Sequence, residues 1–171
     1  ASVMIIIGLI SPIGQELAKY TKETAALGVS LFSIFNASSR IFLGKLADMI
    51  GRIKSLFGIF LICGIAVLTY NLIPTFPFLF WIGVSFVGMC FGGYLANFPA
   101  INVDFYGTKN VGLNYGLLFT AFGVGGLLGN IFAPRVKELT GGYSLAFVIT
   151  GILCLIAAVL TFFIRPPKKL A

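Results

Sequence analysis

The sequence predicts an all-α membrane protein built from six transmembrane helices. Of the 171 residues, 58% are hydrophobic and only 10% are charged, and the mean hydropathy is +1.04. Soluble domains carry about 25% charged residues. No charged residue occurs in three long stretches, 55–103, 111–134 and 139–164. Each stretch is long enough for at least one span of roughly 20 residues, whereas a soluble fold would have almost no polar surface.

Turn residues and charges divide the first half of the chain into three helices. The first covers about 2–13, and it looks truncated because it is too short to cross a bilayer core of about 30 Å. The second helix covers about 25–47 and the third about 55–72. The segment 71–77 contains two prolines, which cannot donate to a helical ladder, so it predicts a turn.

Prolines also divide the second half. The fourth helix covers about 78–100, with Pro99 bending or ending it. The fifth covers about 111–133 and is expected to stop near Pro134. The sixth covers about 143–164, and two prolines at 166 and 167 are expected to stop it.

The distribution of Lys and Arg predicts the orientation in the membrane. Loops richer in these residues lie on the cytoplasmic side, which places both ends of the chain inside a plasma (inner) membrane. The net charge of +7 then reflects loops beside anionic lipid, and no nucleic-acid partner is expected. The predicted cytoplasmic side holds Lys45, Arg52, Lys54, Lys109, Arg165, Lys168 and Lys169, and the other side holds Lys19, Lys22, Arg135 and Lys137.

Residue types argue against catalysis and metal binding. The chain contains no histidine, so a catalytic triad or a zinc site of the usual kind is not expected. Cys63, Cys90 and Cys154 lie within apolar spans and are interpreted as small packing residues. The first apolar segment lacks a basic leader, so no signal peptide is expected. We therefore expect no cofactor and no enzymatic activity.

Arg40 is the one charged residue inside an apolar stretch that begins after Thr24 and ends before Gly44. A guanidinium keeps its proton in a protein, so it needs anions or water. Ionisable groups within membrane segments are costly and often mark a substrate path. Two plainer interpretations are open: Arg40 can extend to the interface near Lys45, or it can pair with Asp104 near the end of the fourth helix.

The loop after the second helix carries the most specific motif, GKLADMIGR from Gly44 to Arg52. Its spacing, Gly-x-Leu-Ala-Asp-x-x-Gly-Arg, resembles the signature loop of the major facilitator superfamily. The glycines at 44 and 51 allow a tight turn, and Asp48 can cap backbone N–H groups of a neighbouring helix. Arg52 can clamp a carboxylate or an anionic lipid. Gly44, Asp48, Gly51 and Arg52 are thus predicted to form a gating loop.

This resemblance covers nearly the whole chain and implies an architecture. In the superfamily the loop follows the second and the eighth helix of twelve, and four spans follow it here. Residues 1–171 therefore resemble helices seven to twelve, the C-terminal half, as two inverted three-helix repeats around a midplane site. The implied partners are the N-terminal six-helix half and the lipid bilayer. At Met49 and Ile53 the chain departs from a pattern that is often basic.

Within the superfamily, the second helix resembles the oxalate/formate antiporter and monocarboxylate transporter group. Asn36 and Arg40 match that group's Asn-x-x-x-Arg in helix eight. Ser33, Asn36 and Arg40 are spaced by three and four residues, so they share one helix face. The planar fork of arginine matches a carboxylate, and this face is predicted to bind a small carboxylate substrate.

The remaining predicted substrate-binding residues are aromatic. The fifth helix resembles the group's helix eleven, where oxalate transporters have a lysine at the position of Phe122. With one cation in this half, a monocarboxylate fits better, its apolar end against Phe119 and Phe122. The resemblance also implies that aromatic residues on helix ten close over the substrate, here Phe91 and Tyr94. The alternative is that these rings face lipid or neighbouring helices.

The leading hypothesis is transport of a monocarboxylate such as lactate, formate or acetate by alternating access, with Arg40 binding the carboxylate. The alternatives are an oxalate/formate dicarboxylate exchanger, a structural bundle that transports nothing, and a membrane enzyme. Proton-linked members of the resembling group have Asp where this chain has Asn36. A proton carrier would thus be Glu16 or lie in the other half; otherwise one anion exchanges for another.

Overall fold

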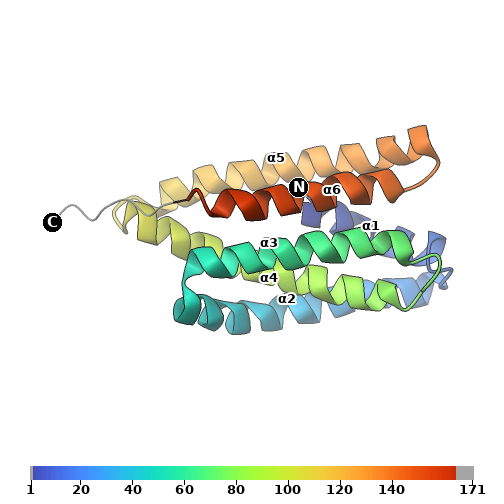
Figure 1. The fold of residues 1–171 in the computed structure, drawn as a ribbon, viewed down its shortest axis with the longest axis horizontal. Helices are drawn as coiled ribbons and strands as arrows, with labels where there is room; N and C mark the ends of the chain where they lie inside the picture. The colour runs from blue at the N-terminus through green and yellow to red at the C-terminus, as the bar shows by residue number, and fades with distance from the viewer. Residues whose placement is uncertain (1, 165–171) are drawn as a thin grey trace.

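The computed structural model describes residues 2–164 and the side chains of 6–164, and within that range it contains helices and turns but no strand (Figure 1). Helices of 15 to 30 residues alternate in direction along one long axis. The elements are α1 (Ser2–Glu16), α2 (Lys22–Ile50), α3 (Arg52–Thr69), the 3-10 turn η1 (Tyr70–Leu72), α4 (Leu79–Tyr106), α5 (Val111–Thr140) and α6 (Ser144–Thr161).

Five of the helical segments are long and apolar enough to cross a membrane, and the predicted all-α membrane fold is confirmed. They are α2, α3 together with η1, α4, α5 and α6. Helix α1 has 15 residues, so it extends only about 22 Å at 1.5 Å per residue, as the sequence predicted for a short first helix. Many large apolar side chains lie exposed on the outside of the bundle, as expected where lipid replaces water.

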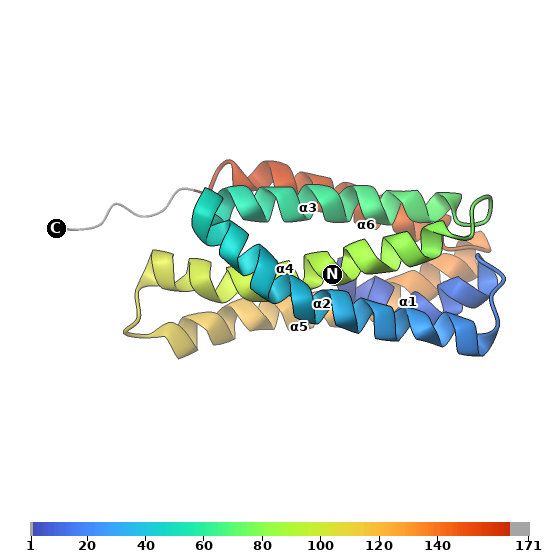
Figure 2. The same cartoon turned by 90° about the horizontal axis from the view of Figure 1, so that it is seen from below.

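The helices form one elongated bundle in which α2 packs on α4 and α3 packs on α6 (Figure 2). Helix α4 also contacts α3, while α1 lies between α2 and α5. The α2–α3 and α4–α5 connections lie at the same end of the bundle, and the α1–α2 and α5–α6 connections lie at the other end (Figure 1). Within residues 2–164, the basic residues near these connections therefore lie in two groups at opposite ends of the bundle.

The helices end where capping residues stop them, and these residues lie outside the apolar stretches from which the limits were predicted. Most helices therefore extend beyond the predicted limits. Helix α2 begins at Lys22 because the Thr21 side chain accepts a hydrogen bond from the Thr24 backbone N–H. It continues to Ile50 because Gly51 adopts a φ of +96°, which ends α2 and allows α3 to begin at once.

Neither Pro99 nor Pro134 ends its helix, which corrects two predicted boundaries. Pro99 and Pro134 both lie inside helices, since in a membrane bundle neighbouring helices and local adjustments compensate for the missing N–H. Helix α4 ends instead at Gly107, with φ +72°, and α5 at Gly141, with φ +74°. The Gly141 N–H bonds to the Lys137 carbonyl, a left-handed glycine stop.

Two glycines of α4 set the contact that positions the candidate site. A Cβ at Gly88 would lie 2.6 Å from the Phe32 carbonyl oxygen, and one at Gly92 would lie 2.2 Å from the Asn36 carbonyl oxygen. The backbones of α2 and α4 therefore touch over two successive turns, which places the polar face of α2 beside the centre of α4.

The predicted stop at Pro166 and Pro167 lies outside the described residues. The same holds for Arg165, Lys168 and Lys169, three of the basic residues used to predict the orientation.

Candidate functional site

Arg40 and Asn36 form a polar pair on the exposed side of α2. The Arg40 Nε donates to the Asn36 Oδ1 at 3.3 Å, and the Arg40 side chain is exposed. Asp104 pairs with Arg52 instead, so among the described residues Arg40 has no carboxylate partner. Its guanidinium is therefore available to an anion from outside this bundle.

Ser33 lies on the same side of α2. At 100° per residue, Ser33, Asn36 and Arg40 fall within about 60° of one another around the helix axis. The Ser33 hydroxyl is exposed and donates to the carbonyl of Val29 at 2.9 Å, which leaves its oxygen able to accept. The three predicted residues thus present one face of α2.

A series of ring contacts, which we call the aromatic ladder, connects α2, α4 and α5. The Phe91 ring of α4 contacts the Phe32 ring of α2, with 5.9 Å between the ring centroids. It also stacks on the Phe122 ring of α5, with 6.0 Å between the centroids. Along α5 the contacts continue from Phe122 to Phe119 at 5.3 Å and from Phe119 to Tyr115 at 4.7 Å. The structure therefore brings together the predicted residues Phe91, Phe119 and Phe122.

The aromatic ladder lies next to the polar pair. Phe32 is one helical turn before Asn36 on α2, and both residues contact glycines of α4 that are themselves one turn apart. Phe119 is 39% exposed and Phe122 is half-buried, so the α5 end of the ladder has free ring surface. A guanidinium and an amide beside apolar rings suit a ligand with one charged end and one apolar end.

Tyr94 lies apart from this cluster. Its side chain is buried against α3, where the centroid of its ring lies 4.9 Å from that of Phe60, and 5.9 Å from the centroid of Phe98 on α4. Phe32 and Tyr115, in contrast, belong to the ladder although the sequence did not single them out. Spacing could have identified both, because Phe32 precedes Asn36 by four residues and Tyr115 precedes Phe119 by four.

A separate groove between α2 and α4 has an apolar lining and a volume of about 350 Å³. None of its lining residues is charged, so it offers nothing to bind a carboxylate. The lining residues are Phe35, Trp81, Ile82, Ser85, Phe86 and Met89.

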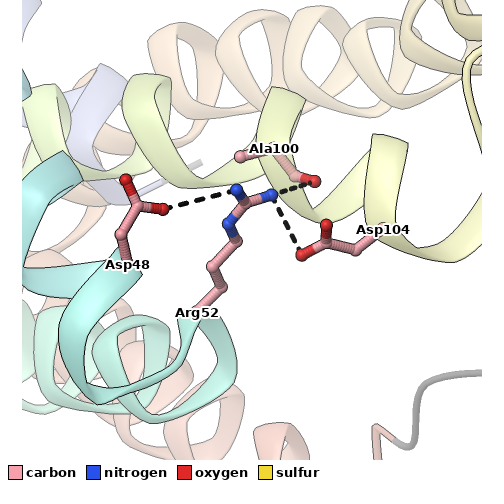
Figure 3. A network of polar contacts seen from close by, with 4 residues as sticks. All are labelled: Asp48, Arg52, Ala100 and Asp104. Carbon is pink, nitrogen blue, oxygen red and sulfur yellow. Dashed lines mark hydrogen bonds and ion pairs between the residues drawn. The ribbon is translucent and has the colours of Figure 1, made fainter.

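Arg52 of the signature loop holds three helices together at one end of the bundle (Figure 3). Its Nη1 lies 2.9 Å from the Asp104 Oδ2 and donates to the Ala100 carbonyl oxygen at 2.6 Å. Its Nη2 lies 3.3 Å from the Asp48 Oδ1. One guanidinium on α3 thus contacts α2 and α4 together, and we call these four residues the Arg52 clamp.

The clamp differs in one respect from the sequence interpretation. Asp48 was expected to cap backbone N–H groups of a neighbouring helix, but α3 has no side-chain cap and Asp48 pairs with Arg52. Gly51 supplies the turn between α2 and α3, and Gly44 packs against α4, where an added Cβ would lie 3.7 Å from that of Ala96. The Asp104 partner was missed because it lies far along the chain from the loop, after the uncharged stretch 55–103.

The opposite end of the bundle has its own charged cluster. The Lys137 Nζ bonds to the Glu16 Oε1, which links α5 to α1. The same ammonium lies 3.2 Å from the Tyr143 hydroxyl and 4.7 Å from the centre of that ring. Glu16 is therefore engaged in an ion pair near a helix end.

The three cysteines are buried, and the Cys63 and Cys154 sulfurs lie 3.8 Å apart. Residues 2–164 contain no group of three or more His, Cys, Asp or Glu that could hold a metal ion.

Comparison with known proteins places the chain among transporters. It is 33% identical over 124 residues to an Escherichia coli protein named "Uncharacterized MFS-type transporter YhjX", a match that covers 71% of this chain and 30% of that protein. It is 32% identical over 170 residues to the Oxalobacter formigenes "Oxalate:formate antiporter", covering 93% of this chain and 39% of the relative. It is 29% identical over 140 residues to mouse "Monocarboxylate transporter 14", a match that covers 80% of this chain and 27% of that protein.

The chain therefore spans between about a quarter and two fifths of the length of these relatives. The family model that describes the Major Facilitator Superfamily matches residues 1–171. With its helical bundle, its candidate membrane spans and its signature loop, this chain belongs to the Major Facilitator Superfamily and forms a half bundle of that fold.

Proposed function

We propose that this chain is part of a secondary transporter that moves a small monocarboxylate across the membrane by alternating access. The observation that carries the proposal is the Arg40 guanidinium, exposed on a membrane helix, bonded to a neutral amide and lacking a carboxylate partner among the described residues. Two Nη groups remain for a carboxylate, and the aromatic ladder, which starts at Phe32 one turn before Asn36, suits a short apolar tail.

The preference for one carboxylate group follows from the charges near the site. Phe122, at the position where the resembling oxalate transporters have lysine, stacks on Phe91 and supplies no second cation. A second carboxylate would then be desolvated without a partner, at a cost of several kcal/mol. Lactate, formate and acetate each have a single carboxylate.

Exchange of oxalate for formate is the second candidate. It is favoured by the similarity to the protein named "Oxalate:formate antiporter" along 93% of this chain. This function needs a second cation, which would come from the other half of the transporter. The two candidates differ in the ratio of oxalate to acetate affinity.

The architecture proposed for the complete transporter has twelve helices, with this chain as helices seven to twelve and an N-terminal six-helix half as its partner. The signature-loop end of the bundle is then proposed to face the cytoplasm, because the sequence assigns seven basic residues to that side of the membrane and four to the other. Release and re-formation of the Arg52 clamp would accompany the movement between inward-open and outward-open states. On this proposal the protein is a carrier, not an enzyme.

Uptake of labelled acetate, lactate, formate and oxalate into proteoliposomes tests the proposal, with the complete transporter as wild type and Arg40→Ala. Lys45→Ala is the matched control, because Lys45 is an exposed cation on the same helix. We expect Arg40→Ala to abolish uptake and Lys45→Ala to preserve it. Normal uptake of every anion by Arg40→Ala would overturn the assigned role.

A structural bundle that transports nothing is distinguished by labelling. A cysteine in place of Ala37, which is exposed next to Asn36, is expected to react with membrane-impermeant reagents from both sides in a transporter. Reaction from neither side would favour a closed scaffold.

A further inference from the structure

We propose that Asn36 is a positioning residue for Arg40. It accepts a hydrogen bond from the Arg40 Nε and so orients the guanidinium for end-on binding of the substrate carboxylate by the two Nη groups. Gly92 of α4 fixes the turn of α2 from which Asn36 acts. This inference rests on the proposed function, since it assigns how that site grips its substrate.

The hydrogen bond between the two side chains decides which donors are free. Arginine has five N–H donors, one on Nε and two on each Nη. The Nε–H of Arg40 is directed to the Asn36 Oδ1 at 3.3 Å. A carboxylate can bind arginine either along the edge that contains Nε or across the two Nη atoms, and Asn36 occupies the first edge. The end-on arrangement is then the one that remains.

The backbone beneath Asn36 is held in place by α4. A Cβ at position 92 would lie 2.2 Å from the Asn36 carbonyl oxygen and 2.0 Å from the Ser39 Oγ, so only glycine fits. Ser39 is 4% exposed, and its hydroxyl donates to the Asn36 carbonyl at 3.0 Å. Asn36 therefore stands on a turn that is packed against another helix, whereas Arg40 is exposed and depends on Asn36 for its orientation.

The neutrality of Asn36 matters as much as its position. An amide oxygen orients the guanidinium without cancelling its charge, so the full positive charge faces the substrate at any physiological pH. A carboxylate at position 36 would instead form an ion pair with Arg40 at i,i+4 and compete with the substrate until it was protonated. Carboxylate binding by this chain should therefore be insensitive to pH well above the pKa of the ligand itself.

The test measures the binding of acetate to the complete transporter at pH values between 5.5 and 8. Binding is detected as the change in thermal stability when acetate is added. Asn36→Leu removes the acceptor at similar volume and should weaken acetate binding roughly 10- to 150-fold, the fold-change that corresponds to losing a hydrogen bond to a charged group. Asn36→Gln, which keeps an amide, should recover part of the affinity. Ser38→Ala, which removes an exposed hydroxyl of α2 outside the face formed by Ser33, Asn36 and Arg40, is the control for a general loss of polarity and should bind acetate as wild type does.

Asn36→Asp, which differs least in shape, supplies the readout that a merely structural role would not give. Its acetate affinity should rise as the pH falls, while that of the wild type stays flat over the same range. Wild-type affinity in Asn36→Leu together with a flat pH profile in Asn36→Asp would overturn the positioning role. Acetate binding that survives Arg40→Gln would instead overturn the proposed function, so the two failures are distinguishable.

Discussion

Replacing Arg52 by glutamine should loosen the signature-loop end of the bundle. Glutamine keeps a polar side chain of similar length but loses the charge and the fork. The substitution removes the ion pairs to Asp48 and Asp104 and the hydrogen bond to the Ala100 carbonyl. It therefore detaches α3 from both α2 and α4 at this end.

The expected magnitude follows from exposure and geometry. The Arg52 side chain is 29% exposed, and the carboxylates are 67% exposed at Asp48 and 53% at Asp104. Solvent-exposed ion pairs contribute roughly 0–1 kcal/mol to the free energy of unfolding. The Arg52–Asp48 pair, at 3.3 Å, is expected at the low end of this range and the Arg52–Asp104 pair, at 2.9 Å, near the high end. The bond to Ala100 adds roughly 1–1.5 kcal/mol. Arg52→Gln should cost about 2–3 kcal/mol in total.

Thermal unfolding of the purified transporter measures this cost. At about 2–4 °C per kcal/mol for a domain of this size, Tm should fall by roughly 4–12 °C. Lys54→Gln, which removes an exposed cation two residues further along α3, should leave Tm unchanged. A double-mutant cycle should give a larger coupling energy with Asp104→Asn than with Asp48→Asn. Equal Tm values for Arg52→Gln and Lys54→Gln would refute the reasoning.

Three further predictions concern other parts of the bundle. Gly83→Ala should lower the free energy of unfolding by about 2–3 kcal/mol in thermal unfolding, because the added Cβ would lie 1.9 Å from the buried ring of Tyr70. Gly112→Ala, whose added Cβ meets open space, should leave it unchanged. Glu16→Gln breaks the ion pair between α1 and α5 and should lower Tm by roughly 1–4 °C at low salt but by less at 1 M salt, where such pairs are screened. Phe122→Lys should raise the affinity for oxalate relative to acetate in competition uptake; an unchanged ratio would count against the single-cation argument.

The sequence predicted the helices well because a membrane makes the signal strong. The three long stretches without charge predict spans, and they were found as α3 to α6; the predicted second helix, which contains Arg40, was found as α2. Helix ends were harder to predict, because Pro99 and Pro134 are tolerated within a bundle while Gly107 and Gly141 provide the actual stops. A one-dimensional pattern does not show which proline has neighbours that compensate for its missing donor.

The candidate site was predicted where it depends on spacing within one helix. Asn36 and Arg40 lie four residues apart, and their hydrogen bond follows from helical geometry. Contacts between helices could not be predicted in the same way. Phe91 and Tyr94 are three residues apart on α4, yet one joins the aromatic ladder and the other is buried against α3, because that difference depends on where neighbouring helices lie.

The most direct test of the central claim is the distance between the guanidinium of Arg40 and the carboxylate of a bound substrate. Solid-state NMR on the complete transporter in lipid, with ¹³C-carboxyl acetate and ¹⁵N-arginine, measures it. With N–H···O distances of 2.7–2.9 Å, the carboxyl carbon should lie about 4 Å from both Nη atoms of Arg40 and farther from its Nε, and the signal should disappear in Arg40→Gln. Acetate that binds without any dipolar contact to Arg40 would contradict the account.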